Sequence, residues 1–214
     1  MLNSSTIFQT KIWEQFQNAL PGRRAGHITR DQADLVWTIL PSVLKKKYLY
    51  INHGPVGGNL VEYWQEILTV AKKHQCAYIK VEPFALASDV SARFAQLNLK
   101  PSNYHIQPST TLVLNLNLTT DELLKQMKPK GRYNIKIASK NAITYQEFDA
   151  QSPTLNDGLD QFYQLLDTTA TRDRFGIHSR EYYSLFLAKL FPHSRLYLAY
   201  HGDKVVAGLI ALFY

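Results

Sequence analysis

The stretch with the strongest chemical character is residues 125–140, KQMKPKGRYNIKIASK, which holds six lysine or arginine residues and no aspartate or glutamate. Pro129 and Gly131 interrupt this stretch, so we expect a helix to begin near Arg132. Three cations recur at every fourth position of that helix and share one face: Arg132, Lys136 and Lys140. Like charges four apart cost a helix roughly 0.2–0.5 kcal/mol per pair. This face is therefore either a solvated basic surface or a site for an anion.

Other elements must position the basic helix. Ile135, Ala138 and Ala142 form a second, apolar face that is expected to dock on a sheet. Upstream, Thr119 and Glu122 have the spacing of a capping box, which predicts a helix that carries leucines 123 and 124. Residues 112–118 alternate leucine with other residues and predict a half-buried strand.

The rest of the chain alternates between strand and helix patterns. Helices are expected over residues 7–20, 59–74, 88–97, 155–168 and 179–190. Strands are expected over residues 37–40, 48–52, 77–81, 195–200 and 204–214, and His201-Gly202-Asp203 makes a hairpin turn between the last two. This alternation predicts a mixed α/β protein.

Gln151-Ser152-Pro153 has the composition of a domain boundary. We therefore expect a first domain over residues 1–150, which includes the basic helix, and the start of a second over residues 151–214. The second ends in an apolar strand with nothing after it to cover it, and natural domains avoid such exposed strands. The chain is expected to be a fragment, or else a partner completes its sheet; we favour the fragment.

Composition limits the classes of partner and site. The net charge of +7 and the pI near 9.4 favour polyanions, which include nucleic acid, phosphorylated sugars and anionic membrane surfaces. The longest apolar run, residues 205–214, is about half a bilayer span, and the N-terminus lacks a signal-peptide core, so we expect a cytoplasmic protein. The single cysteine, Cys76, is expected to be buried filler. The seven histidines show no metal-binding spacing, and we expect neither metal nor cofactor.

Five stretches, in order along the chain, resemble the FemAB/FemX family of peptidoglycan aminoacyltransferases. Leu123-Leu124 with Met127-Lys128 and the segment RYNIK at residues 132–136, followed by Ala138 and Lys140, carry the strongest match. The other four are Phe8-Gln9-Thr10 with Trp13; YINHGPV at residues 50–56; QPSTTLVLNL at residues 107–116; and TRDRF at residues 171–175 with Tyr182-Tyr183. The resemblance implies two acetyltransferase-like (GNAT-like) domains in tandem, of which the second is here incomplete.

The same resemblance implies an activity and its partners. An aminoacyl-tRNA would donate an amino acid to an amine on a UDP-linked or lipid-linked muropeptide, building the interpeptide bridge of peptidoglycan. Both substrates are anionic, so Arg132, Lys136 and Lys140 are expected to bind the RNA or the pyrophosphate. The sequence nominates no catalytic base, and substrate or solvent could take the proton from the amine.

Three further positions follow from the resemblance. Tyr104 stands where a family tyrosine approaches the muropeptide, although a half-buried loop aromatic is at least as good an interpretation. Gln17 stands where the family often has an acceptor-binding lysine, so Lys11, Arg23 or Arg24 would have to replace it. Residues 172–174 are either a substrate cluster built on Arg172 and Arg174 or, as we favour, a salt bridge between two helices.

Two other functions stay open. An acyl-CoA-dependent N-acyltransferase on the related fold would need a Q/R-x-x-G-x-G/A pyrophosphate loop, and these residues contain none. A non-catalytic module that binds RNA or a cell-wall precursor would need the basic face alone. Charge reversal of that face tests the second possibility, because it should abolish binding.

Overall fold

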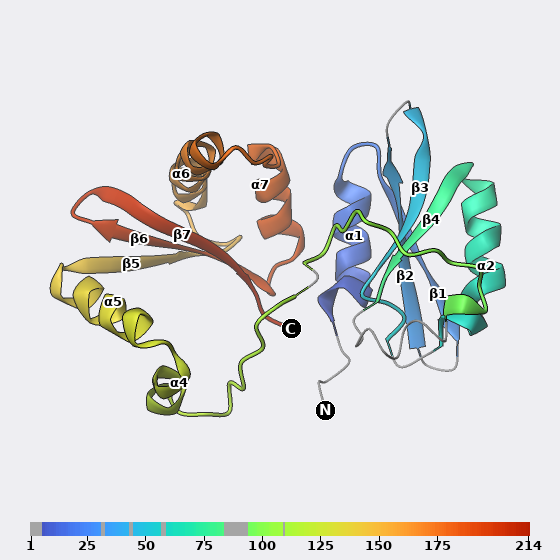
Figure 1. The fold of residues 1–214 in the computed structure, drawn as a ribbon. Coiled ribbons are helices and arrows are strands. Elements are labelled where there is room, and N and C mark those ends of the chain that lie inside the picture. The colour runs from blue at the N-terminus through green and yellow to red at the C-terminus, as the bar shows by residue number, and fades with distance from the viewer. Residues whose placement is uncertain (1–5, 31–32, 43–44, 57–58, 84–93, 109) are drawn as a thin grey trace. The chain divides into compact units, whose positions relative to one another are not determined.

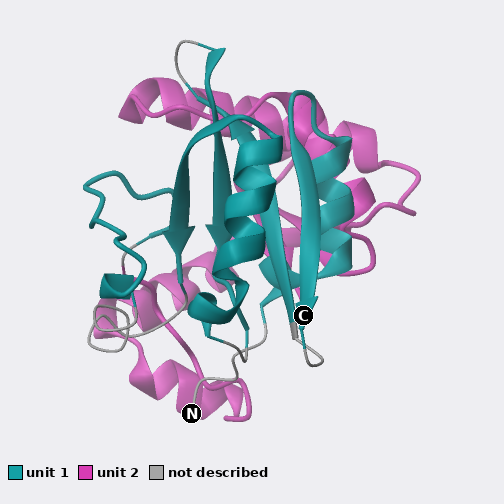
Figure 2. Cartoon of the chain, turned by 90° about the vertical axis from the view of Figure 1, so that its right-hand side faces the viewer, with its two compact units in different colours: residues 1–108, 214 teal, residues 109–213 magenta. Residues whose placement is uncertain are grey.

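A computed structural model describes residues 6–214 except 31–32, 43–44, 57–58, 84–93 and 109. The expected mixed α/β fold is confirmed, since helices alternate with strands along the chain (Figure 1). The chain forms two compact units, residues 1–108 with residue 214 and residues 109–213 (Figure 2). The predicted boundary at residue 150 separates two GNAT-like domains, and it stays a prediction. By packing, the basic helix belongs to the second unit.

Unit 1 is built on a four-stranded sheet with the order β1-β2-β3-β4. Its strands are β1 (Arg24–Arg30), β2 (Ala33–Pro41), β3 (Lys47–Asn52) and β4 (Cys76–Glu82). The first three strands pair antiparallel, whereas β3 and β4 are parallel. The helix α2 (Leu60–Lys73) makes the crossover between β3 and β4, and α1 (Lys11–Ala19) covers the opposite face of the sheet (Figure 1).

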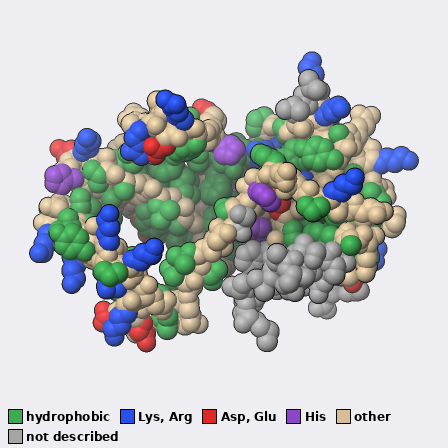
Figure 3. Space-filling model, in the orientation of Figure 1, with side chains coloured by type: hydrophobic (Ala, Val, Ile, Leu, Met, Phe, Trp, Pro, Cys, Tyr) green, Lys and Arg blue, Asp and Glu red, His purple; other side chains and the backbone are tan. Residues whose placement is uncertain are grey.

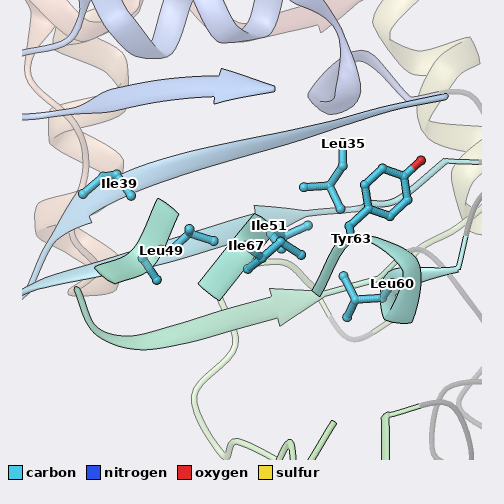
Figure 4. Close-up of a cluster of buried hydrophobic side chains, with 8 residues drawn as sticks. Leu35, Ile39, Leu49, Ile51, Leu60, Tyr63 and Ile67 are labelled. Carbon is cyan, nitrogen blue, oxygen red and sulfur yellow. The ribbon is translucent and has the colours of Figure 1, made fainter. Parts of the chain in front are cut away.

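The core of unit 1 lies between α2 and the sheet (Figure 4). Apolar residues at every third or fourth position of α2 bury one helix face, and alternate residues of β2 and β3 meet it. The buried side chains are Leu35, Ile39, Leu49, Ile51, Leu60, Tyr63, Ile67 and Ala71. Burial of one such large side chain contributes about 1.5–3 kcal/mol relative to its exposed state, so this core holds α2 against β2 and β3.

Two details of unit 1 differ from expectation. The predicted helix over residues 7–20 begins as a 3-10 helix, η1 (Ile7–Gln9), because the Thr10 hydroxyl accepts a hydrogen bond from the Trp13 N–H and starts α1 anew. Strand β1 was not predicted, because its sequence RAGHITR lacks alternating apolar residues. It forms through its continuous antiparallel pairing with β2.

Unit 2 begins with α4 (Thr120–Gln126) and α5 (Pro129–Lys140). Its antiparallel sheet, β5-β6-β7, consists of β5 (Ile143–Phe148), β6 (Ser194–His201) and β7 (Lys204–Leu212). Two helices, α6 (Leu155–Asp173) and α7 (Arg180–Lys189), pack on one face of the sheet. The core consists of Phe148, Leu159, Phe162, Leu187, Leu196 and Leu198. The predicted hairpin between the last two strands is confirmed.

The predicted half-buried strand over residues 112–118 is wrong. No strand is assigned there, and the side chains of Leu112 and Leu116 are 82% and 80% exposed. Alternation shows only that one face is apolar, whereas a strand also needs a neighbour for its backbone N–H and C=O groups. Within the described residues, no strand of either unit pairs with this segment.

Two other expectations concern the chain as a whole. The helix expected over residues 88–97 falls mostly outside the described residues. Among the residues that the structure describes, no helix is both long enough and apolar enough to cross a bilayer.

Candidate functional site

Tyr104 lies on a loop that is fixed to the carboxyl end of β4. Its carbonyl oxygen accepts a hydrogen bond from the Lys80 ammonium, whose Nζ lies 5.4 Å from the centre of the Tyr104 ring. The Ser102 hydroxyl donates to the same carbonyl oxygen at 3.1 Å. The Tyr104 side chain nevertheless remains 69% exposed. A ring that is open to solvent on a fixed backbone is suited to contact a ligand, and the structure contradicts the half-buried interpretation.

Glu82 is the centre of this arrangement. Its carboxylate accepts hydrogen bonds from the Tyr50 hydroxyl at 2.6 Å and from the backbone N–H groups of Ile106 and Gln107 at 2.8 and 2.9 Å. The Lys80 Nζ lies 3.2 Å from the same carboxylate, and the two charged side chains are only 9% and 11% exposed. The carboxylate therefore ties β3, β4 and the loop that carries Tyr104 into one rigid edge.

The pKa values of this edge follow from those contacts. Burial acts to raise the pKa of Glu82, but the donors from Tyr50, Ile106, Gln107 and Lys80 outweigh burial and lower it. Burial and the hydrogen bond to Glu82 raise the pKa of the Tyr50 phenol. Glu82 is therefore an anion and Tyr50 a neutral donor at neutral pH.

A further cation, Arg23, lies close enough to Tyr48 of β3 for its charge to act on that side chain. Its guanidinium donates to the Gln17 side chain at 2.8 Å, and Gln17 is buried. The Tyr48 ring stacks on Tyr78 at 4.9 Å, and burial, with Tyr78 and Tyr104, raises the pKa of Tyr48 to about 12 while the charge of Arg23 opposes that rise. Of the three cations expected to replace a lysine at position 17, the structure brings Arg23 to that position.

The end of β3 adds a second group of residues to this edge. The Gln9 carboxamide accepts from the Val36 N–H at 2.8 Å and donates to the Asn52 carbonyl at 2.6 Å. A Cβ at position 54 would lie 2.6 Å from the Gln9 carboxamide, so a larger residue than Gly54 would displace that side chain. His53 has a left-handed backbone and its ring packs edge-on against Phe8, while burial lowers its pKa. His53 is therefore largely neutral at pH 7.

Sequence reasoning missed Lys80, Glu82 and Tyr50. A signal for them was present, since Lys80 and Glu82 are two residues apart in the otherwise apolar strand CAYIKVE and must share one face. The register places them beside Tyr50 and Asn52 of β3. Ligands of open α/β sheets commonly bind outside the carboxyl ends of parallel strands, which is where these residues lie.

The second candidate region is α5. Here the three predicted cations differ, because Arg132 has partners within the described residues and Lys136 and Lys140 do not. The Arg132 guanidinium donates to the carbonyl oxygens of Met127 and, at 3.5 Å, Lys125. Those carbonyls belong to the last turn of α4 and the residue after it, so Arg132 caps that helix. Lys136 and Lys140 are exposed, and no ion pair or hydrogen bond of either side chain is found among the described residues. Figure 3 shows lysine and arginine side chains beside hydrophobic ones over α4 and α5.

Two expectations about α5 are corrected. The helix begins at Pro129 and not near Arg132, because proline is tolerated in the first turn, where its missing N–H costs nothing. The predicted apolar face is also wrong, since Ile135 is 45% exposed and Ala142 lies beyond the helix with a left-handed backbone. The half-buried residues of this helix are Gly131, Arg132, Ile137 and Ala138. The capping box of Thr119 and Glu122 is confirmed on α4.

Arg172 and Arg174 lie at the end of α6. Both Arg172–Asp173 hydrogen bonds are 2.8 Å long and join neighbouring residues of one helix, so the predicted bridge between two helices is wrong. Arg174 is the left-handed C-cap residue of α6. The Arg172 side chain is 71% exposed. Within the described ranges, no group of three or more His, Cys, Asp or Glu side chains could hold a metal ion.

Comparison with known proteins gives a family and several relatives. A family model described as the FemAB family matches residues 94–202, just over half of the chain. Lipid II:glycine glycyltransferases of Staphylococcus aureus, including those of strains USA300 and NCTC 8325, are 24% identical to it over 150 residues. The match covers 59% of this chain and 34% of each relative. The chain therefore spans about a third of the length of these relatives.

Proposed function

The chain belongs to the FemAB family, and from that membership we propose that it is an aminoacyltransferase of peptidoglycan bridge formation. It would transfer an amino acid from an aminoacyl-tRNA to the peptide stem of a peptidoglycan precursor. The observation that carries this proposal is the extent of the family match, which includes both Tyr104 and the whole of α5. The names of the relatives make glycine the first amino acid to test and lipid II the first acceptor.

The proposed reaction exchanges an ester for an amide. The amine nitrogen of the stem peptide attacks the carbonyl carbon of the aminoacyl ester, and a carbon–nitrogen bond forms. The bond from that carbon to the ribose oxygen breaks, and the proton lost by the amine ends on the ribose oxygen. The protein must therefore hold two anionic substrates, of which one is RNA and the other carries a pyrophosphate.

For the acceptor, we propose the edge of unit 1 at the carboxyl ends of β3 and β4. The exposed Tyr104 ring would contact the muropeptide, with its carbonyl held by Lys80 and the following loop residue Ile106 held by Glu82. Arg23, which the register places near the amino end of β3, would supply the cation that the family places at residue 17, because its guanidinium donates to the Gln17 side chain. An arginine can bind a phosphate or carboxylate through two parallel hydrogen bonds, which suits this role.

For the donor, we propose α5. Two of its exposed lysines, Lys136 and Lys140, can neutralise backbone phosphates of the RNA. Arg132 would act through the protein by holding α4 against the start of α5. Arg172 and Arg174, exposed at the end of α6, stay candidates for contact with either substrate.

A transfer assay tests the proposal. Residues 1–214, and the protein as made in its native cell, are each incubated with radiolabelled glycyl-tRNA and lipid II. We expect label in the muropeptide after extraction, and none when free glycine replaces glycyl-tRNA. Parallel reactions with other aminoacyl-tRNAs and with the UDP-linked precursor identify the amino acid and the acceptor. Absence of product from the native-cell protein with every donor and both acceptors would refute the proposal.

A further inference from the structure

We propose that Tyr133, together with Lys136 and Lys140, forms a surface on α5 that binds single-stranded RNA by stacking of a base on the tyrosine ring. This inference rests on the proposed function, which requires an RNA donor, and it names the residue that would contact a base. Tyr133 is 62% exposed, although an exposed tyrosine ring leaves much apolar area in water. Within the described ranges, no ring contact or hydrogen bond of its side chain is found.

The helix places the Tyr133 ring on the same face as Lys136 and Lys140. Residues three and seven positions apart in an α-helix lie within about one-sixth of a turn of each other. Lys136 and Lys140 stand at these positions after Tyr133, so the three side chains share one face. An aromatic ring on the same face as cations is the combination that proteins use for single strands, in which bases stack on the ring and phosphates contact the cations.

The local charge supports an anionic ligand. Between residues 125 and 140 there is no carboxylate to neutralise the lysines. The nearest preceding acidic residue, Glu122, is already bound to the Thr119 backbone and hydroxyl in the capping box. Lys136 and Lys140 therefore have no acidic neighbour within residues 125–140 that could neutralise their charges.

The distribution of apolar residues favours RNA over a membrane surface. Ile135, an exposed large apolar residue of α5, stands two positions after Tyr133 and therefore lies on nearly the opposite side of the helix. A helix that lies in a membrane interface needs one continuous apolar face opposite its charges. Here the exposed ring is on the charged side, so the face is not amphipathic in that sense.

Binding to a fluorescently labelled single-stranded RNA that ends in CCA tests this surface. The titration uses the intact protein over a series of salt concentrations, with the variants Tyr133→Ala and Tyr133→Phe. The control is Lys189→Ala, which removes an exposed lysine near the end of α7 in the same unit. Thermal unfolding of each variant shows whether it folds as the parent does.

We expect Tyr133→Ala to weaken RNA binding by roughly 5- to 150-fold, the loss that one base–aromatic stack produces, without a change in salt dependence. Tyr133→Phe should bind as the parent does, because the ring and not the hydroxyl is needed. Lys136→Ala and Lys140→Ala should each lower the slope of log affinity against log salt by about 0.7. Lys189→Ala should leave both quantities unchanged.

Two controls set the outcomes that would overturn the inference. A fully paired RNA duplex exposes no base faces, so Tyr133→Ala should leave its affinity unchanged. Equal losses for duplex and single strand, or no loss for either, would exclude stacking at Tyr133. Binding to vesicles that contain phosphatidylserine, lost in Tyr133→Ala while RNA binding persists, would assign the surface to a membrane instead.

The transfer assay separates this inference from the proposed function. If Tyr133→Ala weakens RNA binding but the parent makes no extended muropeptide, the stacking surface stands and the transferase proposal fails. If the parent transfers glycine and Tyr133→Ala transfers it with an unchanged KM for glycyl-tRNA, the transferase stands and the stacking surface fails.

Discussion

The Tyr104 edge of unit 1 and the α5 surface of unit 2 both present cations, yet they hold them in opposite ways. Lys80 is buried, and its charge is balanced by Glu82 at 3.2 Å. Lys136 and Lys140 are exposed, and no described residue balances them. A buried cation that is paired inside the protein is held in one position by its carboxylate, whereas an exposed one is available to a ligand.

The two regions would recognise a ligand differently, the edge of unit 1 by its shape and the α5 surface by its charge. The edge of unit 1 fixes the position of one exposed ring through hydrogen bonds from three elements, so a ligand there would meet a preformed surface. The α5 surface relies on a short helix with flexible lysines, and its attraction falls as salt rises. Substitutions should therefore change stability at the first region and affinity at the second.

The largest effect is expected from Glu82→Ala. This change leaves Lys80 as a buried charge without its carboxylate and removes the acceptor for the loop N–H groups, so unit 1 should lose about 3–5 kcal/mol of unfolding free energy. Urea denaturation measures the loss. The control Glu66→Ala, which removes an exposed ion pair with Arg30, should cost far less. Similar costs for both variants would show that the Lys80–Glu82 pair does not hold the edge.

A smaller effect should separate Arg132 from its helical neighbour Lys136. Arg132→Ala removes the hydrogen bonds to the end of α4 and is expected to cost unit 2 about 1 kcal/mol of unfolding free energy. Lys136→Ala should leave that quantity unchanged. Thermal unfolding of both variants measures the difference, and a loss of stability in Lys136→Ala alone would reverse the roles given to the two residues.

The smallest expected effect is a pH dependence from His53. Burial lowers its pKa in the folded protein below the unfolded value near 6.5, so the unfolded chain binds the proton more tightly. The associated stability is present above pH 6.5 and is lost as the pH falls below it. His53→Asn, which suits the left-handed backbone, should flatten the decrease between pH 7 and 5.5 in urea titrations. An identical decrease in the variant would exclude His53 as its source.

Local patterns in the sequence predicted the fold well where the signal was contained in a few neighbouring residues. The capping box at Thr119 needs only Glu122 three positions later, and the hairpin after β6 needs only its turn residues. The strand predicted over residues 112–118 failed because pairing depends on a partner elsewhere in the chain. Strand β1 was missed for the converse reason, since β2 supplies a partner that its own sequence does not reveal.

The candidate site shows the same limit. The spacing of Arg132, Lys136 and Lys140 correctly placed them on one helix, but it could not show that Arg132 binds the end of α4. The Glu82 arrangement depends on the register of two parallel strands and on a loop more than twenty residues later. Tyr104 was found by resemblance alone, and its exposed ring on a fixed backbone became visible only in the structure.

The Gln9 side chain forms the hydrogen bonds that a backbone peptide group would form. Its C=O accepts from the Val36 N–H, and its NH2 donates to the Asn52 carbonyl. A glutamate has nearly the same shape but cannot donate at neutral pH, so its carboxylate would face a carbonyl oxygen in a buried setting. Loss of ammonia from this one amide, the ordinary chemical ageing of glutamine, would therefore turn an attraction into a repulsion at the end of β3. Position 9 therefore accepts glutamine and disfavours glutamate, which has nearly the same size but lacks the NH2 donor.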